Sequence, residues 1–366
     1  MAAPDSAEAM VAAGRRDVCH RRAMADYRAI VPNTKARRAR NARPASFVSA
    51  GALLCLAIAG STNAAGLPRN WPMAPAELEK RLGEQDIEIR EAKPAGSGVT
   101  GAWKLAIAFS DGKTLQAKWK SAPPETADGW NNSPRRELAT YEIQRWLFDE
   151  NDYVVPTIEP RCFALEKIRS FQADSKPTLA GSSCVLGTVA VWLEDVTAPK
   201  DAYDKKRFRS DPLYARYLAD LNVLTYVIGH RDGHQGNILV STDASDPRSY
   251  AVDNGMAFDL LPWNLNVNNW FRIRVPWLRR ETVDRLRKVD KKTIRALAVV
   301  AELEVDNAGM LHVVAPEAPF EPEIEDGFAR RGNRIQLGLG SHEIHEVEER
   351  VEKLIRKVDS GRQPVR

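Results

Sequence analysis

The sequence predicts an α+β protein of two lobes, the first rich in strands and the second mainly helical. Apolar and polar residues alternate over 86–91, 102–109 and 114–120, the period of half-buried strands, and a Ser-Asp-Gly-Lys turn joins the last two. Further along, 211–228 and 281–303 have the longer apolar spacing of helices. Strands followed by helices predict segregated lobes rather than an alternating βα sheet.

The elements between these stretches fit the same order. Pro75–Leu82 is expected to be a short helix, and Pro134 opens a second helix over Arg135–Phe148. Two more strands are expected at Cys162–Ile168 and Val185–Leu193. In the helical part, Asp211 is the expected N-cap of its helix with Pro212 at the first helical position.

Two short strands, Asn237–Val240 and Tyr250–Val252, are expected to form a hairpin, and His342–Val358 a last helix. We therefore divide the chain into a leader (1–64), a linker (65–85), an N-lobe (86–195) and a C-lobe (196–366).

The first 64 residues look like a targeting leader. They carry ten Lys and Arg against four Asp and Glu, so the remaining residues are close to neutral, with 43 basic and 45 acidic side chains. Basic residues at 35–43 precede the apolar run Phe47–Gly60, whose fourteen residues would reach about 21 Å as a helix. That is short of the roughly 30 Å hydrocarbon core. A signal peptide is therefore expected rather than a permanent span, and nothing in the charge balance predicts nucleic acid as a partner.

Cysteine usage agrees with export. Cys19 and Cys55 lie in the leader, which leaves Cys162 and Cys184 as a pair in the remainder. An even pair in an exported domain favours a disulfide over two unrelated buried thiols.

The most specific pattern is His230-Arg231-Asp232 with Asn237 five residues after the Asp, followed by Asp253-Asn254-Gly255. This layout is typical of phosphoryl-transfer sites. In such a site Asp232 would orient an acceptor hydroxyl and take its proton, and Asn237 and Asp253 would offer oxygen ligands to Mg²⁺ or Mn²⁺. His230 is expected to have a packing role.

His234, in the same loop, is expected to contact either the loop or a phosphate. A second motif precedes the loop: Gly96, Gly98 and Gly101 fit G-x-G-x-x-G. A dinucleotide site needs a helix after these glycines, and 102–109 has the pattern of a strand. A glycine flap over nucleotide phosphates is therefore the better interpretation.

A positive charge for the phosphates is expected on the third strand. Lys118 and Lys120 share one face of it, and Lys120, near the strand's end, is preferred as the catalytic lysine. Glu137 on the following helix is the expected ion-pair partner, with Glu142 in reserve.

Two other patterns are better explained by ordinary structural roles than by a functional site. His342 and His345 are three residues apart but have no further ligands nearby, which is typical of a helix surface. An aromatic run with interspersed arginines could bind an acceptor, although packing of the helical lobe is favoured: Trp263, Trp270, Phe271, Trp277, Arg272, Arg274, Arg279 and Arg280.

Together these residues resemble the protein-kinase-like superfamily, specifically its atypical secretory-pathway branch, the Golgi kinases of secreted proteins and proteoglycan xylose. Asp253-Asn254-Gly255 has Asn where ordinary protein kinases have Phe, and the helix around Glu137 looks like the Glu-bearing helix of that branch. The Asp232-x-His234-x-x-Asn237 spacing is also similar to phosphoinositide kinases. The resemblance covers about 86–260. It departs from the Golgi kinases at Asn237, where they often have an acidic residue.

The resemblance implies a two-lobed protein-kinase-like fold and an exported kinase. Such an enzyme would use ATP with Mg²⁺ or Mn²⁺ and pass the γ-phosphoryl group to a hydroxyl of a protein, sugar or lipid. Two alternatives stay open: a nucleotide-binding pseudokinase acting as an interaction module, and a small-molecule phosphotransferase of the antibiotic-modifying type. The adenine-binding hinge is expected near Glu194–Val196.

Overall fold

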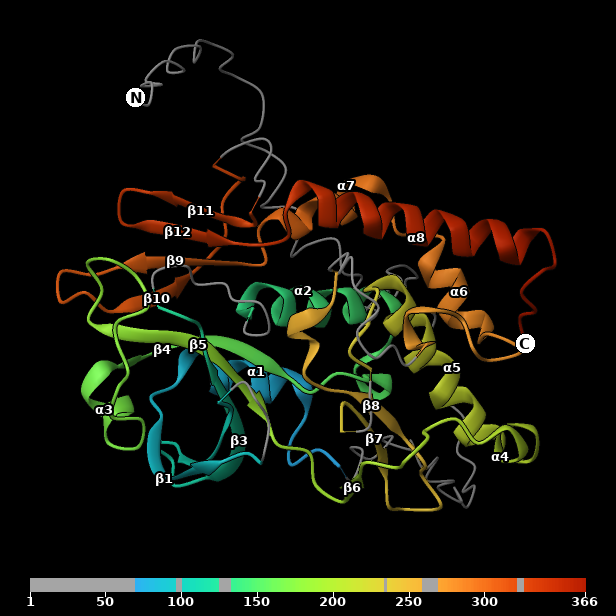
Figure 1. Cartoon of the computed structure of the whole chain (residues 1–366), viewed down its shortest axis with the longest axis horizontal. Helices are drawn as coiled ribbons and strands as arrows, with labels where there is room; N and C mark the ends of the chain where they lie inside the picture. The colour runs from blue at the N-terminus through green and yellow to red at the C-terminus, as the bar shows by residue number, and fades with distance from the viewer. Residues whose placement is uncertain (1–69, 97–100, 125–132, 234–235, 259–268, 321–325) are drawn as a thin grey trace, which may run out of the picture. The chain divides into compact units, whose positions relative to one another are not determined.

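The computed structural model describes residues 70–96, 101–124, 133–233, 236–258, 269–320 and 326–366 (Figure 1). All of them belong to one unit, Leu56–Arg366. The leader, with its apolar run, lies outside the described residues. Among the described residues, none of the helices is both long and apolar enough to cross a bilayer.

The strand-rich part is a five-stranded antiparallel sheet in the order β1-β2-β3-β5-β4. Its strands are β1 (Glu88–Pro94), β2 (Trp103–Ala108), β3 (Thr114–Ser121), β4 (Ile158–Ala164) and β5 (Cys184–Val191). Two helices, α1 (Pro75–Glu84) and α2 (Pro134–Leu147), pack against β4. Each begins with a proline, whose fixed φ suits the first helical turn.

One strand lies earlier than its sequence pattern indicated. The strand expected at Cys162–Ile168 is β4, Ile158–Ala164, and the chain then turns into the short helix α3 (Leu165–Arg169). β4 includes Pro160, which has no N–H to donate to a neighbouring strand. β4 is an edge strand of the sheet, however, and an edge tolerates a residue that lacks an N–H.

The expected disulfide is confirmed. Cys162 on β4 is bonded to Cys184 on β5, with the two Cα atoms 5.6 Å apart. The bond joins neighbouring strands and closes the 22-residue interval that contains α3.

A second, three-stranded sheet, β6-β7-β8, belongs to the following part of the chain. It contains β6 (Val196–Thr197), β7 (Ile238–Ser241) and β8 (Ser249–Ala251), and the long helix α5 (Pro212–Val227) packs on β8. Asp211 caps α5 as expected, since its carboxylate accepts a hydrogen bond from the Tyr214 amide at 3.0 Å. The chain also forms four short helices up to residue 271: η1 (Glu150–Asp152), α4 (Lys205–Ser210), η2 (Asn254–Met256) and η3 (Asn269–Phe271).

The C-terminal part differs from the prediction. The helix expected over Glu281–Leu303 is divided into α6 (Arg280–Leu286), α7 (Lys291–Arg295) and η4 (Ala296–Ala298), and a strand begins at Ala301. A third sheet follows, in the order β10-β9-β12-β11, before the last helix, α8 (Ser341–Asp359). Its strands are β9 (Ala301–Val305), β10 (Leu311–Val314), β11 (Phe328–Arg331) and β12 (Arg334–Leu337).

One neighbour of the strand that begins at Ala301 lies far along the chain. Residues 301–305 alternate between apolar and polar in the sequence, but their burial does not: Ala301, Glu302 and Leu303 are buried and Glu304 is exposed. The partner of β9 in the middle of this sheet, β12, is about thirty residues further along the chain. Periodicity over a short window cannot identify such a partner.

The described structure therefore has a strand-rich part followed by a part built mainly from helices with two small sheets. The predicted two-lobed α+β architecture is confirmed. β5 ends at Val191 in the first sheet and β6 begins at Val196 in the second. The exact lobe boundary at 195/196 stays a prediction.

Candidate functional site

Three of the predicted charged residues meet between β3, α2 and the segment after β8. Lys120, only 4% exposed, places its Nζ 2.5 Å from Asp253 Oδ1 and 3.9 Å from Glu137 Oε1. Alternation along β3 turns Lys120 to the face where Glu137, in the first turn of α2, is also buried. The structure thus pairs the two residues that the sequence proposed as partners and adds Asp253 as a third.

Glu137 also fixes the segment that carries Asp253. Its second carboxylate oxygen, Oε2, accepts a hydrogen bond from the Asn254 amide at 3.1 Å. Asp253 itself has left-handed backbone angles, φ 59° and ψ 57°. Non-glycine residues adopt this conformation at some cost and mostly where surrounding contacts impose it. One buried carboxylate therefore orients both the lysine and the backbone next to Asp253.

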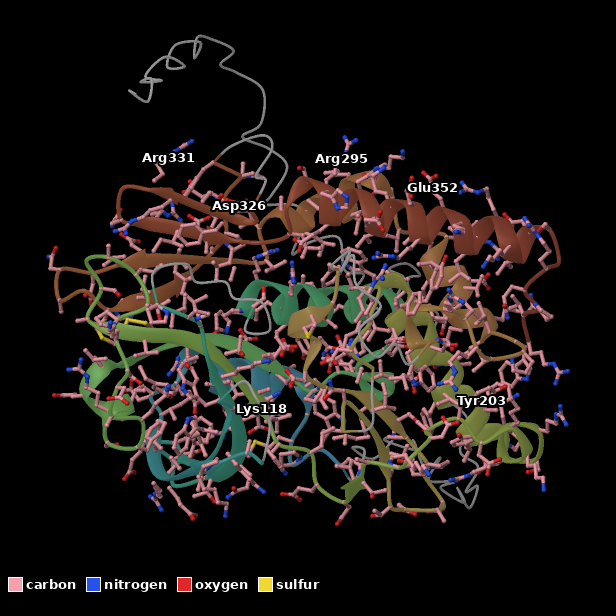
Figure 2. All side chains as sticks on the ribbon, in the orientation of Figure 1. Lys118, Tyr203, Arg295, Asp326, Arg331 and Glu352 are labelled. Carbon is pink, nitrogen blue, oxygen red and sulfur yellow. A yellow bond between two sulfur atoms is a disulfide. The ribbon has the colours of Figure 1, made fainter. Side chains whose placement is uncertain are left out.

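Lys118 approaches the same carboxylate from two positions earlier on β3. Its Nζ lies 3.5 Å from Asp253 Oδ1, and its side chain is labelled in Figure 2. Burial raises the pKa of Asp253, but the positive charges of Lys118 and Lys120 outweigh that effect and lower the pKa to about 2. Asp253 is therefore a carboxylate at any physiological pH.

Asp232 and Asn237 are joined within the loop that precedes β7. Asn237 Nδ2 donates to the backbone oxygen of Asp232 at 2.9 Å and to its Oδ2 at 3.0 Å. The backbone oxygen of Asn237 accepts from the Val252 amide at 2.9 Å. That bond continues the β7–β8 pairing and brings Asn237 to the end of the hairpin from which Asp253 follows. Asp232 and Asn237 are therefore placed next to the residue that precedes Asp253.

The glycine motif lies in the connection between β1 and β2. The amide of Ala95 donates to the Ala102 oxygen at 2.9 Å, which closes the ends of the loop. Gly96 and Gly101 have φ values of 136° and 65°, backbone conformations that favour glycine. A strand follows the motif, so no helix N-terminus is available there for a dinucleotide pyrophosphate. Gly98 and His234 lie outside the described residues.

Glu142, the reserve partner of the lysine, and the two histidines of α8 make other contacts or are exposed. Glu142 pairs with Arg145 at 3.7 Å, which leaves Glu137 as the partner of Lys120. His345 is exposed on α8 and lies 3.5 Å from Glu349. His342 is exposed on the same helix.

The segment 269–275 is held beside the loop that contains Asp232. A Cβ atom at Gly233, next to Asp232, would lie 3.1 Å from the Cβ atom of Trp270, so the loop packs directly on that tryptophan. The buried Asn222 of α5 binds the segment further along: it donates to the Arg272 oxygen at 2.8 Å and accepts from the Arg274 amide at 2.7 Å. Trp270 is therefore a packing residue, as expected for part of the aromatic run. Trp263 lies outside the described residues.

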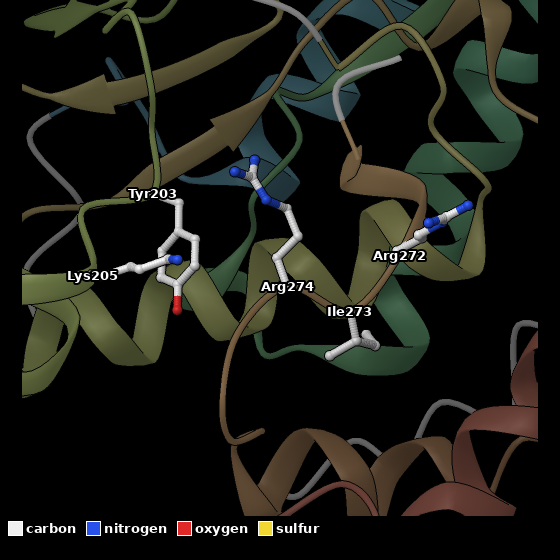
Figure 3. A pocket seen from close by; sticks show the side chains of 5 residues that line it. All are labelled: Tyr203, Lys205, Arg272, Ile273 and Arg274. Carbon is white, nitrogen blue, oxygen red and sulfur yellow. The ribbon is translucent and has the colours of Figure 1, made fainter. Parts of the chain in front are cut away.

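A small cavity of about 280 Å³ opens on the same segment. Its lining is basic and aromatic (Figure 3): Tyr203, Lys205, Arg272, Ile273 and Arg274. The Arg274 guanidinium lies 4.6 Å from the centre of the Trp270 ring and 3.7 Å from the Asp201 carboxylate. Part of the positive charge is thus already compensated.

The donors at the site suit a divalent ion only in combination with a ligand. Among the described residues, no three His, Cys, Asp or Glu side chains are grouped so that they could hold a metal alone. Asp253 offers an ionised carboxylate and Asn237 an amide oxygen, since its nitrogen is the donor to Asp232. Mg²⁺ is often bound by one or two protein oxygens together with substrate phosphates, so this donor set fits.

Sequence reasoning missed the contact that fixes the connection between the first two sheets. Asn70 is buried and donates from Nδ2 to the Glu194 oxygen at 2.8 Å and to the Asp195 oxygen at 3.1 Å. Its Oδ1 accepts from the Tyr250 hydroxyl at 2.9 Å. The sequence predicts a linker over 65–85, and no local pattern marks a lone Asn more than 120 residues from its partners. Asn70 thus binds the backbone of the segment proposed as the hinge.

No protein-family model matches the chain, and neither does any curated protein. Two similar solved structures are of the Golgi casein kinase. The one with Mn/ADP bound has 16% identity over 78% of this chain and 75% of that chain (TM-score 0.47), and the other 15% over 78% and 74% (TM-score 0.45). The structure of hydra Fam20 with sugar has 13% identity over 80% of this chain and 92% of that chain (TM-score 0.47).

Proposed function

We propose that the protein is a kinase that transfers the γ-phosphoryl group of ATP to a hydroxyl group, with Mg²⁺ or Mn²⁺. The observation that carries the proposal is the buried contact of Lys120 with both Glu137 and Asp253. Lys120 and Glu137 are buried and Asp253 is partly buried, so these charges are costly to desolvate, and their pairing is weak evidence for stability alone. A phosphoryl-transfer site needs this set of charges, because catalysis there rests on positioning and electrostatic stabilisation.

Each charged or polar residue of the site would have a role set by its chemistry. Lys120 would pair with phosphate oxygens of the nucleotide, with Glu137 holding its ammonium group in place. Asp253 and Asn237 would hold the divalent ion. When bound, that ion neutralises negative charge on the phosphate oxygens.

Asp232 would receive the acceptor. Its carboxylate would accept the hydrogen bond of the acceptor hydroxyl and take the proton as the phosphoryl group moves. Asn237 Nδ2, at 3.0 Å from Asp232 Oδ2, keeps that carboxylate oriented. The residues Gly96 and Gly101 would let backbone amides of the β1–β2 loop cover the phosphates.

The proposal includes export. A disulfide between Cys162 and Cys184 is the state expected outside the reducing cytosol, and it agrees with the basic and apolar leader. The acceptor class, whether protein, sugar or lipid, is left open by the described site.

The first test is nucleotide binding. We expect ATP with Mn²⁺ or Mg²⁺ to raise the melting temperature of the purified chain, by about 2.7 kcal/mol of stabilisation at a hundredfold excess over Kd. Asp253→Ala should abolish the metal-dependent part of the rise. Asp284→Ala, which removes an exposed carboxylate of α6, should leave it intact.

A well-folded protein that shows no rise with either metal would refute the kinase proposal. Binding without transfer to any acceptor or to water would instead favour the pseudokinase alternative.

A further inference from the structure

Helix α2 begins with two adjacent arginines, an unfavourable choice at this end of a helix. The helix dipole leaves partial positive charge at the N-terminus, so cations in the first turn are repelled unless they are paired. Arg135 and Arg136 nevertheless stand immediately before Glu137, the partner of Lys120. What compensates these two charges therefore also determines where Glu137 lies.

Glu343 pairs with both arginines. It lies in the first turn of α8, is 8% exposed, and is more than 200 residues away in sequence. Its Oε2 accepts from Arg135 Nη1, and its Oε1 accepts from Arg136 Nε at 2.8 Å. Oε2 also accepts from the Gly340 amide at 2.9 Å, which fixes the carboxylate to the start of its own helix.

The surroundings of Arg135 leave it little freedom. Its Nη1 also donates to the Gly338 oxygen at 3.3 Å. On the other side, a Cβ atom at Gly327 would lie 2.8 Å from the same nitrogen, and Gly327 has a φ of 67°. Arg135 thus fills a corner formed by the turn before β11, the end of β12 and the start of α8. The third sheet and α8 together receive the N-terminus of α2.

Helix α8 also contacts the segment just before Asp232. Arg350 follows Glu343 by seven residues, two helical turns, and so lies on the same face of α8, about 10 Å further along. Its guanidinium packs on Gly229, where a Cβ atom would lie 2.7 Å from Cζ, and Gly229 precedes His230-Arg231-Asp232. Burial and the nearby charge of Arg231 lower the pKa of Arg350. Arg350 Nη2 forms an ion pair with Glu346 Oε2 at 2.8 Å.

We propose that Glu343 is a positioning residue for nucleotide binding, acting through α2 on the Lys120–Glu137 pair. This inference rests on the proposed kinase function. α8 would hold α2 in place through Glu343, and the start of the loop that contains Asp232 through Arg350. Lys120 and Glu137 are already 3.9 Å apart, so a small displacement of α2 would separate them and weaken the bond from Asn254 to Glu137.

The test is a double-mutant cycle read out as the Kd for ATP with Mn²⁺, using the full chain. We expect Glu343→Gln to weaken binding about tenfold. In a Glu137→Gln background the same substitution should have little further effect, because Glu343 acts through Glu137. Glu343→Asp, which keeps the charge, should recover affinity to within about threefold of the wild type.

Glu352→Gln is the matched control. It removes an exposed carboxylate of the same helix, paired with Arg356 and Lys291 and labelled in Figure 2, and should leave Kd unchanged. If the Glu343→Gln variant does not fold, the Arg136→Gln variant takes its place in the cycle. It removes one of the two arginine contacts of Glu343, and we again expect weaker binding of ATP with Mn²⁺.

Two results would overturn the inference. One is wild-type affinity in the folded Glu343 and Arg136 variants. The other is an equal loss with and without Glu137, which would indicate a general effect on stability. Failure of the wild type to bind ATP with either metal would instead refute the proposed function, so the two failures are distinguishable.

Discussion

Lys120 Nζ and Asp253 Oδ1 lie 2.5 Å apart, so the lysine that would bind phosphate and the carboxylate that would bind metal neutralise each other. Binding a nucleotide with its metal would replace this contact by two others: Lys120 with phosphate oxygens, and Asp253 with the ion. Glu137, which contacts both Lys120 and the Asn254 amide, stays as the common anchor.

The first prediction concerns that anchor. Glu137→Gln should weaken the binding of ATP with Mn²⁺ at least tenfold, because it removes the charge that holds Lys120. Glu142→Gln, one turn further along α2, changes a glutamate that pairs with Arg145 and should have little effect. Calorimetric titration of both variants checks this. Similar losses in the two would show that α2 needs acidic residues in general, and not the Lys120 partner in particular.

The second prediction concerns the charge of Asp253. Lys118→Met should raise the pKa of Asp253 from about 2 toward the ordinary value near 3.8, because one of the two opposing charges is lost. Lys104→Met is the control, since Lys104 is paired with Lys118 across β2 and β3 but stacks on Trp192 at 4.3 Å. Titration of the ¹³C carboxyl resonance of Asp253 measures both. An unchanged pKa in Lys118→Met would contradict the assigned role of this lysine.

The placement of most candidate site residues could be predicted because short segments of the sequence determine it. The alternation around Lys118 and Lys120 placed both on one face of β3, and the spacing from Asp232 to Asn237 to Asp253 defined a loop and a hairpin. Pro134 gave the first residue of α2, and so put Glu137 in its first turn. In each case the structural cause lies within a few residues of its effect.

The parts that could not be predicted depend on distant partners. Asn70 binds the backbone of 194–195, and Glu343 pairs with Arg135 and Arg136. In both cases the partners are more than 120 residues apart in the sequence. Sequence periodicity gives each residue a face but not the element it will meet. The sheet around β9 was missed partly for the same reason, since β9 pairs with the distant β12 as well as with β10, which follows it directly.

The third prediction is a pH dependence of stability from Asp220. This carboxyl group is fully buried on α5, where burial raises its pKa to about 6 against hydrogen bonds from Thr282 and Arg279. Because the folded-state pKa is above the unfolded value near 3.8, its stabilising contribution is present at low pH and is lost as pH rises through 6. From pH 7.5 down to 5, the wild type should gain about 1.4 kcal/mol relative to Asp220→Asn.

Urea unfolding of both proteins across that range checks the sign. The comparison cancels groups that titrate identically in the two chains. A stability difference that is constant with pH, or that falls as pH is lowered, would contradict a raised pKa at this position.

The fourth prediction concerns the bond between Cys162 and Cys184. Replacing both by serine should lower the free energy of unfolding by about 3 kcal/mol, as expected for a cross-link that closes some 22 residues. The lost constraint acts mainly on the unfolded chain, so the sheet β4–β5 should keep its register. Reduced wild-type protein should therefore lose the same amount, and nucleotide binding should persist below the new melting temperature. Loss of binding in a folded serine variant would show instead that the bond also holds the strand-rich part in its binding form.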